Sequence, residues 1–449
     1  MSTRMDGIFQ QDLFSGTMRM DVVIAEGDPY RILAERLPWI EMGNTANHHR
    51  ALRVDIENGR PLNLRLHLGA LIAQGMNGWT DRETEQMIAY HAGVRLLCGL
   101  SQSSETIVHT CIVEFRHQVG PEGVKELNGI VVRWAKQTGF TDAKLCSSDT
   151  TVQEAPIAYP TEVGHLKRIS EKLALMGTRM KQGLKGNLQT LSEKVGKVFS
   201  QIRLFTRGKT QKAIEKKKRL TRKLHSLVRQ MLYQVEKGSQ ELSAKSRAQY
   251  EEELIRYRLM LTQIWQWMRI GFHPRGKLLS LWHTEARAIT RSKAGKATEF
   301  GRRWIISRLT GGYLIGAPCA VGADNDLKII PEVLADFETV MGETPDMMVY
   351  DRGADSTPNH GSLKDSGVKH DAIFRKGRNS LKDLSPQLMA KARRERPLSE
   401  AGIATIKCHR YGFTKPRAKS VESCILKGHL AIFGANLTHL AKDLAGTVS

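Results

Sequence analysis

Three acidic residues occupy positions that could build a divalent-metal site. Asp149 ends a strand-like run after "KLCSS", Asp351 ends another after "DMMVY", and Glu400 lies in a segment with helical spacing. Functional groups gather at the carboxyl ends of strands in open α/β sheets. Mg²⁺ and Mn²⁺ prefer oxygen ligands, and two such ions can promote an in-line displacement at phosphorus. The spacing therefore indicates a two-ion site, with ordinary surface acids as the alternative.

Cations flank the third of these acids. Arg396, Glu400 and Lys407 are spaced i, i+4 and i+11, so a continuous helix would present them on roughly one face. The acid could hold a metal while its neighbours bind phosphates. An ion-pair ladder on an exposed helix is the alternative. Pro397 has no N–H to donate, so the helix is expected to start or kink there.

Alternating strand and helix patterns surround these residues. The run "TEFGRRWIISRLTGGYLIGAPCAV" predicts two strands joined at Thr310-Gly311-Gly312. Helical patterns follow at residues 329–342, 385–412 and 422–444, and strand patterns at 345–351 and 371–377. The order predicts a mixed α/β layer architecture.

The first 140 residues show mainly helical spacing. A capping box, Thr80-x-x-Glu83, opens a helix directly after a turn at Gly78. Two helices joined by a short glycine-containing turn fit a helix-turn-helix-like unit. A plain helical bundle fits the same pattern, and the sequence leaves both open.

Positive charge is concentrated in the middle of the chain. Residues 165–247 contain 22 Lys and Arg, 5 Glu and no Asp. The formal net charge of the whole chain is +22. Apolar stripes at 195–205 and 254–268 predict a pair of long helices here. The densest run includes Lys216, Lys217, Lys218 and Arg219, which could contact phosphates or form a solvated helix face.

The composition also argues against several classes. The longest uncharged stretch, residues 309–323, is shorter than the roughly 18 apolar residues that span a bilayer. No basic region followed by an apolar core opens the chain, and the six cysteines form no CxxC pair. We therefore expect a reduced, cytoplasmic protein with a polyanionic partner, nucleic acid before membrane.

Four blocks, in order, resemble the DDE transposases of bacterial insertion sequences. They are "DTTVQEAPIAYPTEVGHL", "KATEFGRRWIISRLTGGYLIG", "VYDRGADSTPNHGSLKDSG" and "RPLSEAGIATIKCHRYGFTKPR". The N-terminal helical segment is similar to the domain that opens many of these proteins. One departure is Arg393, where the related signature has a tyrosine.

The resemblance implies a particular fold and site. The fold would be α/β. A helical N-terminal DNA-binding domain (1–140) would precede a catalytic domain (141–449) with an RNase H-like mixed-sheet core. A long basic helical insertion (about 165–284) would lie between the first and second core strands of the catalytic domain. Asp149, Asp351 and Glu400 would hold two Mg²⁺ or Mn²⁺ ions, with Asp351 on a strand adjacent to that of Asp149. Arg396 and Lys407 would contact DNA phosphates.

The implied activity is binding of insertion-sequence ends followed by metal-dependent DNA cleavage and strand transfer. Partners would be terminal-repeat and target DNA, with the protein at least dimeric during the reaction, without a membrane, and associated with the bacterial nucleoid. A non-catalytic DNA-binding relative and an RNase H-like nuclease without end joining are the alternatives. We expect Asp326 and Glu338 to lie off the site, and Trp265 and Trp304 to lie in the core.

Overall fold

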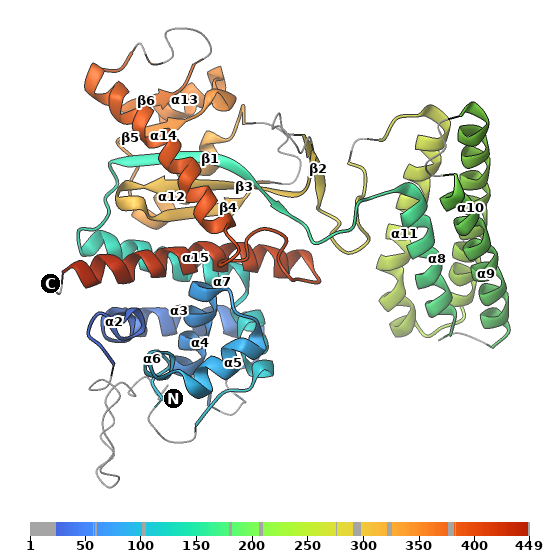
Figure 1. Ribbon diagram of the computed structural model, residues 1–449, viewed down its shortest axis with the longest axis horizontal. Helices are drawn as coiled ribbons and strands as arrows, with labels where there is room; N and C mark the ends of the chain where they lie inside the picture. The colour runs from blue at the N-terminus through green and yellow to red at the C-terminus, as the bar shows by residue number, and fades with distance from the viewer. Residues whose placement is uncertain are drawn as a thin grey trace. The chain divides into compact units, whose positions relative to one another are not determined.

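The computed structural model describes residues 24–447, except for residues 57, 59–60, 101–104, 179–181, 206–209, 275, 291–297, 321–325, 376–380 and 382 (Figure 1). The chain divides into two compact units. The first combines Met1–Pro156 with Gly301–Ser449, and the second is Ile157–Phe300. The expected basic insertion lies inside the second unit. The boundary expected at residue 140 stays a prediction.

The N-terminal helices of the first unit follow their capping signals. The predicted capping box is confirmed, because Thr80 Oγ1 accepts from Glu83 N at 3.2 Å and Glu83 Oε2 accepts from Thr80 N at 2.6 Å. Gly78 ends the preceding helix with φ 65°, a conformation that favours glycine. The helices are α2 (Pro29–Arg36), α3 (Trp39–Ala51), α4 (Leu64–Asn77), α5 (Asp81–Tyr90), α6 (Ala92–Leu97) and α7 (His109–Gln137).

Burial distinguishes the two helices that meet at Gly78. Every residue of α4 from Leu64 to Met76 is buried, so this helix is a central core element. In α5 only Thr84 and Ile88 are buried, which leaves most of its side chains accessible. A surface role for the pair would therefore fall to α5.

The sheet is mixed, as predicted. Its order is β2–β3–β1–β5–β6, and β4 also pairs with β3. β1 is antiparallel to β3 and parallel to β5, and β5 is parallel to β6. The strands are β1 (Leu145–Glu154), β2 (Arg287–Thr290), β3 (Thr298–Leu309), β4 (Leu314–Pro318), β5 (Met347–Tyr350) and β6 (His370–Ile373).

The predicted connection between two of these strands is confirmed. β3 and β4 pair antiparallel around the 3₁₀ turn η1 (Thr310–Gly312). Gly311 and Gly312 have φ values of 79° and 103°, where a side chain would be strained. A Cβ at Gly311 would also lie 2.1 Å from the backbone oxygen of Phe140.

Helices pack on both faces of the sheet. Trp304 and Ile306 of β3 pack with Ile403 and Ile406, and Trp304 is fully buried as expected. On the other face, Ile305 joins the large core that contains residues of α7 and α12. The remaining elements of this unit are α12 (Ile330–Met341), η2 (Arg352–Ala354), α13 (Thr357–Asp365), α14 (Pro386–Lys407) and α15 (Val421–Gly446).

One helix start differs from expectation. α14 does not begin at Pro397, because it runs unbroken from Pro386 to Lys407. Ser385 caps it, with Oγ accepting from Leu388 N at 3.4 Å, and Pro386 takes the first helical position. Arg396, Glu400 and Lys407 consequently follow one face of a single helix.

The second unit has four helices in its described part, where the sequence predicted a pair. They are α8 (Glu162–Thr178), α9 (Gln182–Leu204), α10 (Gln211–Ser239) and α11 (Ala244–Ile270), seen side by side in Figure 1. Their buried faces form one separate core, to which α10 contributes Leu220, Leu224 and Val228. Among the described residues, no helix is long and apolar enough to cross a membrane.

Candidate active site

The two predicted aspartates lie close to the pairing of the parallel strands β1 and β5. Asp351 directly follows β5, but Asp149 is the fifth of the ten residues of β1, which continues to Glu154, so the prediction that Asp149 ends a strand is wrong. Ser147 of β1 pairs with Val349 of β5, and Asp149 and Asp351 each follow two residues later. Side chains two residues apart point to the same face of an extended strand. Asp149 and Asp351 therefore lie at one level and on one face, and both are half-buried.

Local hydrogen bonds orient both carboxylates. Thr150 N donates to Asp149 Oδ1 at 2.7 Å, and Gly353 N donates to Asp351 Oδ1 at 2.8 Å. Asp351 keeps extended backbone angles, φ −76° and ψ 178°, and caps η2 directly after β5. The short strand and the immediate turn place its side chain at the edge of the sheet.

Helix α14 lies over this same face of the sheet. Ser399 Oγ donates to Ser147 Oγ at 2.6 Å and also lies 3.1 Å from Ser147 O. One turn earlier, Glu395 forms a buried ion pair of 2.6 Å with Arg308 of β3. Both contacts were missed from the sequence, and together they fix the helix that carries Glu400.

The predicted residues on α14 have different surroundings. Glu400 follows the anchor Ser399 and is exposed. Arg396 is half-buried, with its guanidinium 5.4 Å from the centre of the Phe374 ring, and Lys407 is the last residue of the helix. Among the described residues, no group of three or more His, Cys, Asp or Glu side chains is arranged to hold a metal ion.

Asp326 lies beside Asp351, so the expectation that it lies off the site is wrong. A Cβ built on Gly353 would be 2.9 Å from Asp351 Oδ1 and 3.0 Å from Asp326 Oδ2, which puts these oxygens within about 6 Å of each other. Asp326 also pairs with Arg303 of β3, which in turn donates to Thr150 Oγ1 at 3.3 Å. Burial raises the pKa of Asp326; Arg303 opposes this shift, and the charge of Asp351 adds to it.

The hydroxyl of Tyr350 is a buried polar group close to these acids. Its side chain is 1% exposed, and its oxygen has no hydrogen-bond partner among the described residues. Burial, followed by the charges of Asp326, Asp149 and Asp351, raises the pKa of this phenol well above 10. An unpaired buried hydroxyl is unfavourable in a folded protein.

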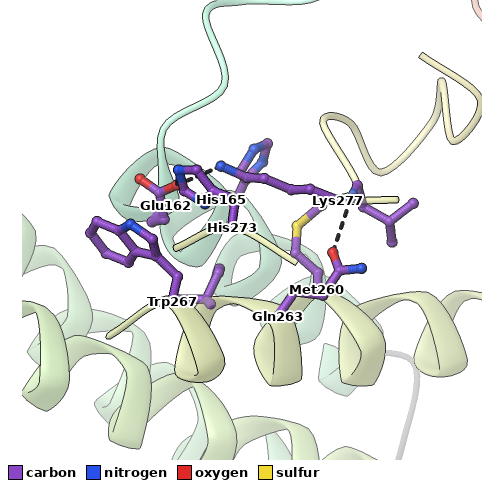
Figure 2. Close-up of a pocket in the computed structure, with 9 residues that line it drawn as sticks. Glu162, His165, Met260, Gln263, Trp267, His273 and Lys277 are labelled. Atoms are coloured by element: carbon purple, nitrogen blue, oxygen red, sulfur yellow. Dashed lines mark hydrogen bonds and ion pairs between the residues drawn. The ribbon is translucent and has the colours of Figure 1, made fainter. Parts of the chain in front are cut away.

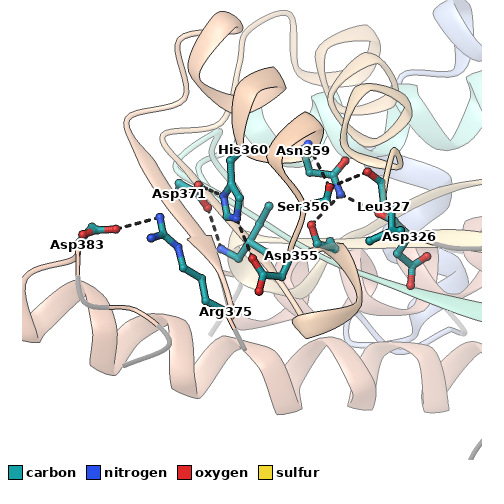
Figure 3. Close-up of polar contacts among 11 residues, drawn as sticks. Asp326, Leu327, Asp355, Ser356, Asn359, His360, Asp371, Arg375 and Asp383 are labelled. Carbon is teal, nitrogen blue, oxygen red and sulfur yellow. Dashed lines mark hydrogen bonds and ion pairs between the residues drawn. The ribbon is translucent and has the colours of Figure 1, made fainter. Parts of the chain in front are cut away.

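A buried asparagine joins the segments that carry Asp326 and Asp351. Asn359 Nδ2 donates to Asp326 O at 2.7 Å and to Ala354 O at 2.8 Å (Figure 3). Ser356 Oγ donates to Leu327 O at 2.7 Å. These bonds hold two stretches that are distant in sequence against each other.

His360 holds the same turn against the neighbouring strand. Its Nδ1 is 2.5 Å from Asp371 Oδ2 in β6 and its Nε2 is 3.2 Å from Asp355 Oδ1 (Figure 3). Although burial lowers it, hydrogen bonds to Asp371 and Asp355 raise the pKa of His360 overall. The protonated imidazole would donate to both carboxylates and tie the turn after Asp351 to the sheet.

The predicted phosphate-binding run lies on α10. Lys216, Lys218 and Arg219 are exposed and Lys217 is half-buried, while the ammonium of Lys216 lies 4.5 Å from the centre of the Phe205 ring. Trp265, expected in the core, is 43% exposed and lies against Arg269 at 4.7 Å. Helical spacing alone did not reveal that no other helix covers this side of α11.

The second unit also contains a small cavity of about 10 Å³, lined by residues of α8, α11 and the loop after α11 (Figure 2). Glu162 and Lys277 form an ion pair of 2.6 Å on its wall, and the Trp267 and His273 rings stack at 5.7 Å. This volume fits about one water molecule, so the cavity is not a substrate site.

Comparisons with known proteins concern mainly the N-terminal part of the chain. Residues 18–118 match the family described as "Transposase domain (DUF772)". The chain is also 28% identical over 160 residues to "Uncharacterized protein ORF8 in nfe locus" of Rhizobium meliloti, which covers 34% of this chain and 73% of that protein. No solved structure matches. The predicted resemblance to transposases of insertion sequences is confirmed.

Proposed function

We propose that this chain is a DNA transposase that binds the ends of an insertion sequence and catalyses metal-dependent strand cleavage and strand transfer. One observation carries the proposal: Asp149 of β1 and Asp351 directly after β5 lie at one level of these neighbouring parallel strands, on the face that α14 covers, in a chain whose N-terminal region matches a transposase family. The resemblance implies that the strands of Asp149 and Asp351 are neighbours in an RNase H-like core. The pairing of β1 with β5 supports this part of the proposal.

The proposed cofactor is a pair of Mg²⁺ or Mn²⁺ ions. Two of the donors fit this chemistry, since Asp149 and Asp351 lie at one level of neighbouring strands, and a Cβ would fill the space beside Gly353. Bound ions of this kind activate an oxygen nucleophile and stabilise a leaving oxygen. Asp149, Asp351 and Glu400 would hold them, and Mg²⁺ commonly completes its coordination with water and substrate phosphates.

The cations have the complementary role of neutralising DNA. Arg396 and Lys407 flank Glu400 on one helix face and would bind phosphates near the cleaved bond. Lys216, Lys217, Lys218 and Arg219 would add sequence-independent affinity from the second unit. Recognition of the element ends is assigned to the N-terminal helices, with α5 offering the accessible side chains. Pairing of two ends would require at least a dimer, associated with the nucleoid.

The test compares cleavage and joining by the full chain with those of Asp149→Asn, Asp351→Asn and Glu400→Gln. Each variant should lose both reactions on a labelled duplex that carries an element end, yet still shift that duplex in a binding assay. Glu338→Gln on α12 is the matched control and should react like the wild type. Cleavage without joining by the wild type would favour the nuclease, and full binding without either reaction would favour the non-catalytic relative.

A further inference from the structure

The space between two carboxylates beside Gly353 is the starting observation. Asp351 Oδ1 and Asp326 Oδ2 lie 2.9 Å and 3.0 Å from the position that a Cβ on Gly353 would occupy. Gly353 does not have the left-handed φ that would require glycine, so its role at this position is to leave room. Any larger residue would occupy the space that the two oxygens face.

The position of Asp326 is fixed from several directions. Arg303 binds the Oδ1 side of the carboxylate and also donates to Thr150 of β1, so Oδ2 is the oxygen on the Gly353 side. The backbone oxygen of Asp326 accepts from Asn359, which is 0% exposed and binds the turn after Asp351 as well. The pair of carboxylates is thus built into the fold and does not depend on flexible surface side chains.

The buried hydroxyl of Tyr350 is an independent sign of a ligand. Tyr350 directly precedes Asp351, its hydroxyl has no hydrogen-bond partner among the described residues, and the charges that act on it most are those of Asp326, Asp149 and Asp351. Two neighbouring carboxylates repel each other, and a buried hydroxyl without a partner is unfavourable. A hydrated cation would correct both, because it neutralises the acids and its bound water is a hydrogen-bonding group.

The dimensions suit a small, hard cation. Mg²⁺ binds oxygen at about 2.1 Å and is commonly held by one or two carboxylates, several waters and substrate phosphates. Oxygens within about 6 Å allow one direct and one water-mediated contact. Such a site needs no three-residue protein cage, which agrees with the lack of one among the described residues.

We infer that Asp326 is a metal-binding carboxylate outside the predicted triad, which shares a divalent cation of the Mg²⁺ class with Asp351 across the space at Gly353. The inference rests on the proposed function, since it adds a residue to the same site. In this arrangement, Oδ2 of Asp326 binds the cation. Oδ1 of Asp326 binds Arg303, which holds the carboxylate in place.

The experiment titrates the full chain with Mn²⁺ in the presence of an element-end duplex and measures free Mn²⁺ by electron paramagnetic resonance. Asp326→Asn should weaken Mn²⁺ binding at least tenfold, and Gly353→Ala should weaken it comparably without changing any charge. Glu338→Gln should bind like the wild type. Thermal unfolding without metal checks that each variant is folded.

Arg303→Gln separates a ligand from a structural partner. If Asp326 binds the cation, removal of the competing guanidinium should leave Mn²⁺ affinity unchanged or increase it, opposite to Asp326→Asn. Equal weakening by both variants, or wild-type affinity in a folded Asp326→Asn, would overturn the inference and leave Asp326 as the partner of Arg303. In that case a loss of Mn²⁺ binding by Asp351→Asn would still support the proposed function. Wild-type affinity in Asp149→Asn, Asp351→Asn and Asp326→Asn together would remove the metal site itself.

Discussion

Asp149 and Asp351 lie at the same level on neighbouring parallel strands, two residues beyond the paired Ser147 and Val349. Their side chains therefore lie on one face of the sheet, although their positions in the sequence differ by 202. Two negative groups held at one level of neighbouring strands repel each other unless a cation or a proton intervenes. This repulsion would lower the stability of the metal-free protein, and the same geometry would favour metal binding.

Strand cleavage should consequently require a divalent metal. Mg²⁺ or Mn²⁺ should support cleavage of an end-containing duplex, and a chelator should abolish it. Ca²⁺ should permit assembly on DNA without cleavage, because its looser and larger coordination shell misplaces the reacting oxygens. The measurement is cleavage of labelled DNA in each metal, with complex formation followed in parallel. Full activity in chelator would exclude the metal-dependent mechanism.

Removal of the Ser399 hydroxyl should lower both the stability of the protein and its DNA-cleavage activity. Its hydroxyl donates to Ser147 in a buried setting, and Ser399→Ala would leave the Ser147 hydroxyl without that partner. We expect a loss of about 1–2 kcal/mol in the free energy of unfolding. Cleavage should fall further than stability at a temperature where the variant is fully folded, because Glu400 is the next residue on the helix.

A serine on α13 provides the matched control for this change. Ser362 Oγ donates to Pro358 O in an exposed setting, so Ser362→Ala should alter stability by less than about 0.5 kcal/mol. Urea unfolding of both variants measures the difference. Equal effects would mean that the Ser399–Ser147 contact does not position α14.

Local patterns were sufficient to predict the strands that carry the two aspartates. The hairpin at Thr310-Gly311-Gly312, a strand that contains Asp149 and a strand that ends before Asp351 follow from turn chemistry and apolar runs. These signals depend on neighbours in the sequence, and they did not reveal that β1 continues past Asp149 to Glu154. The α/β class could be predicted from the same signals.

Tertiary contacts explain what the sequence did not reveal. Asp326 follows a stretch without strand or helix pattern, and hydrogen bonds of Asn359 and Ser356 bring its segment to the turn after Asp351. The sequence therefore did not reveal that Asp326 lies near Asp351.

The bundle of the second unit was underestimated because dense Lys and Arg residues obscure the apolar stripe of α10, which includes Leu220, Leu224 and Val228.

Reversal of the basic run on α10 should change how DNA binding depends on salt. Lys216, Lys217, Lys218 and Arg219 precede the buried stripe of the helix, so their replacement by Glu should leave α10 folded. Each phosphate contact that is lost removes released counterions, so the slope of log affinity against log salt should become shallower by up to about 4. Binding to all duplexes should weaken, whatever their sequence.

Replacement of the same four residues by Gln is the graded control. It removes the positive charges without adding negative ones and should leave the fold unchanged. Its effect on the salt slope should therefore be smaller than that of the replacement by Glu. Binding is measured by fluorescence anisotropy from low to high salt, with circular dichroism to check helicity. A slope identical to that of the wild type in both variants would identify the run as a solvated helix face.

His165 should make the second unit sensitive to acid. Its side chain is 2% exposed, and neither ring nitrogen has a hydrogen-bond partner in the described part of the chain (Figure 2). Burial, with the charges of Arg168 and Lys277, lowers the pKa of His165 to about 4. The unfolded chain, with a pKa near 6.5, binds more protons than the folded one between these values. Stability must therefore decrease as the pH falls from about 6.5 to about 4.

The change that tests this is His165→Leu, which keeps a similar volume against Met260, Ile264 and Leu278 on the same cavity wall. Near pH 8 it should be neutral or stabilise the protein by roughly 1 kcal/mol, because two unpaired buried nitrogens disappear. Near pH 5 the gain should be larger, approaching about 3 kcal/mol only as the pH nears 4, since that proton linkage is removed. Guanidinium unfolding of both proteins at the two pH values measures the difference. If the variant lost stability between pH 8 and pH 5 as steeply as the wild type, acid sensitivity would have to come from other groups.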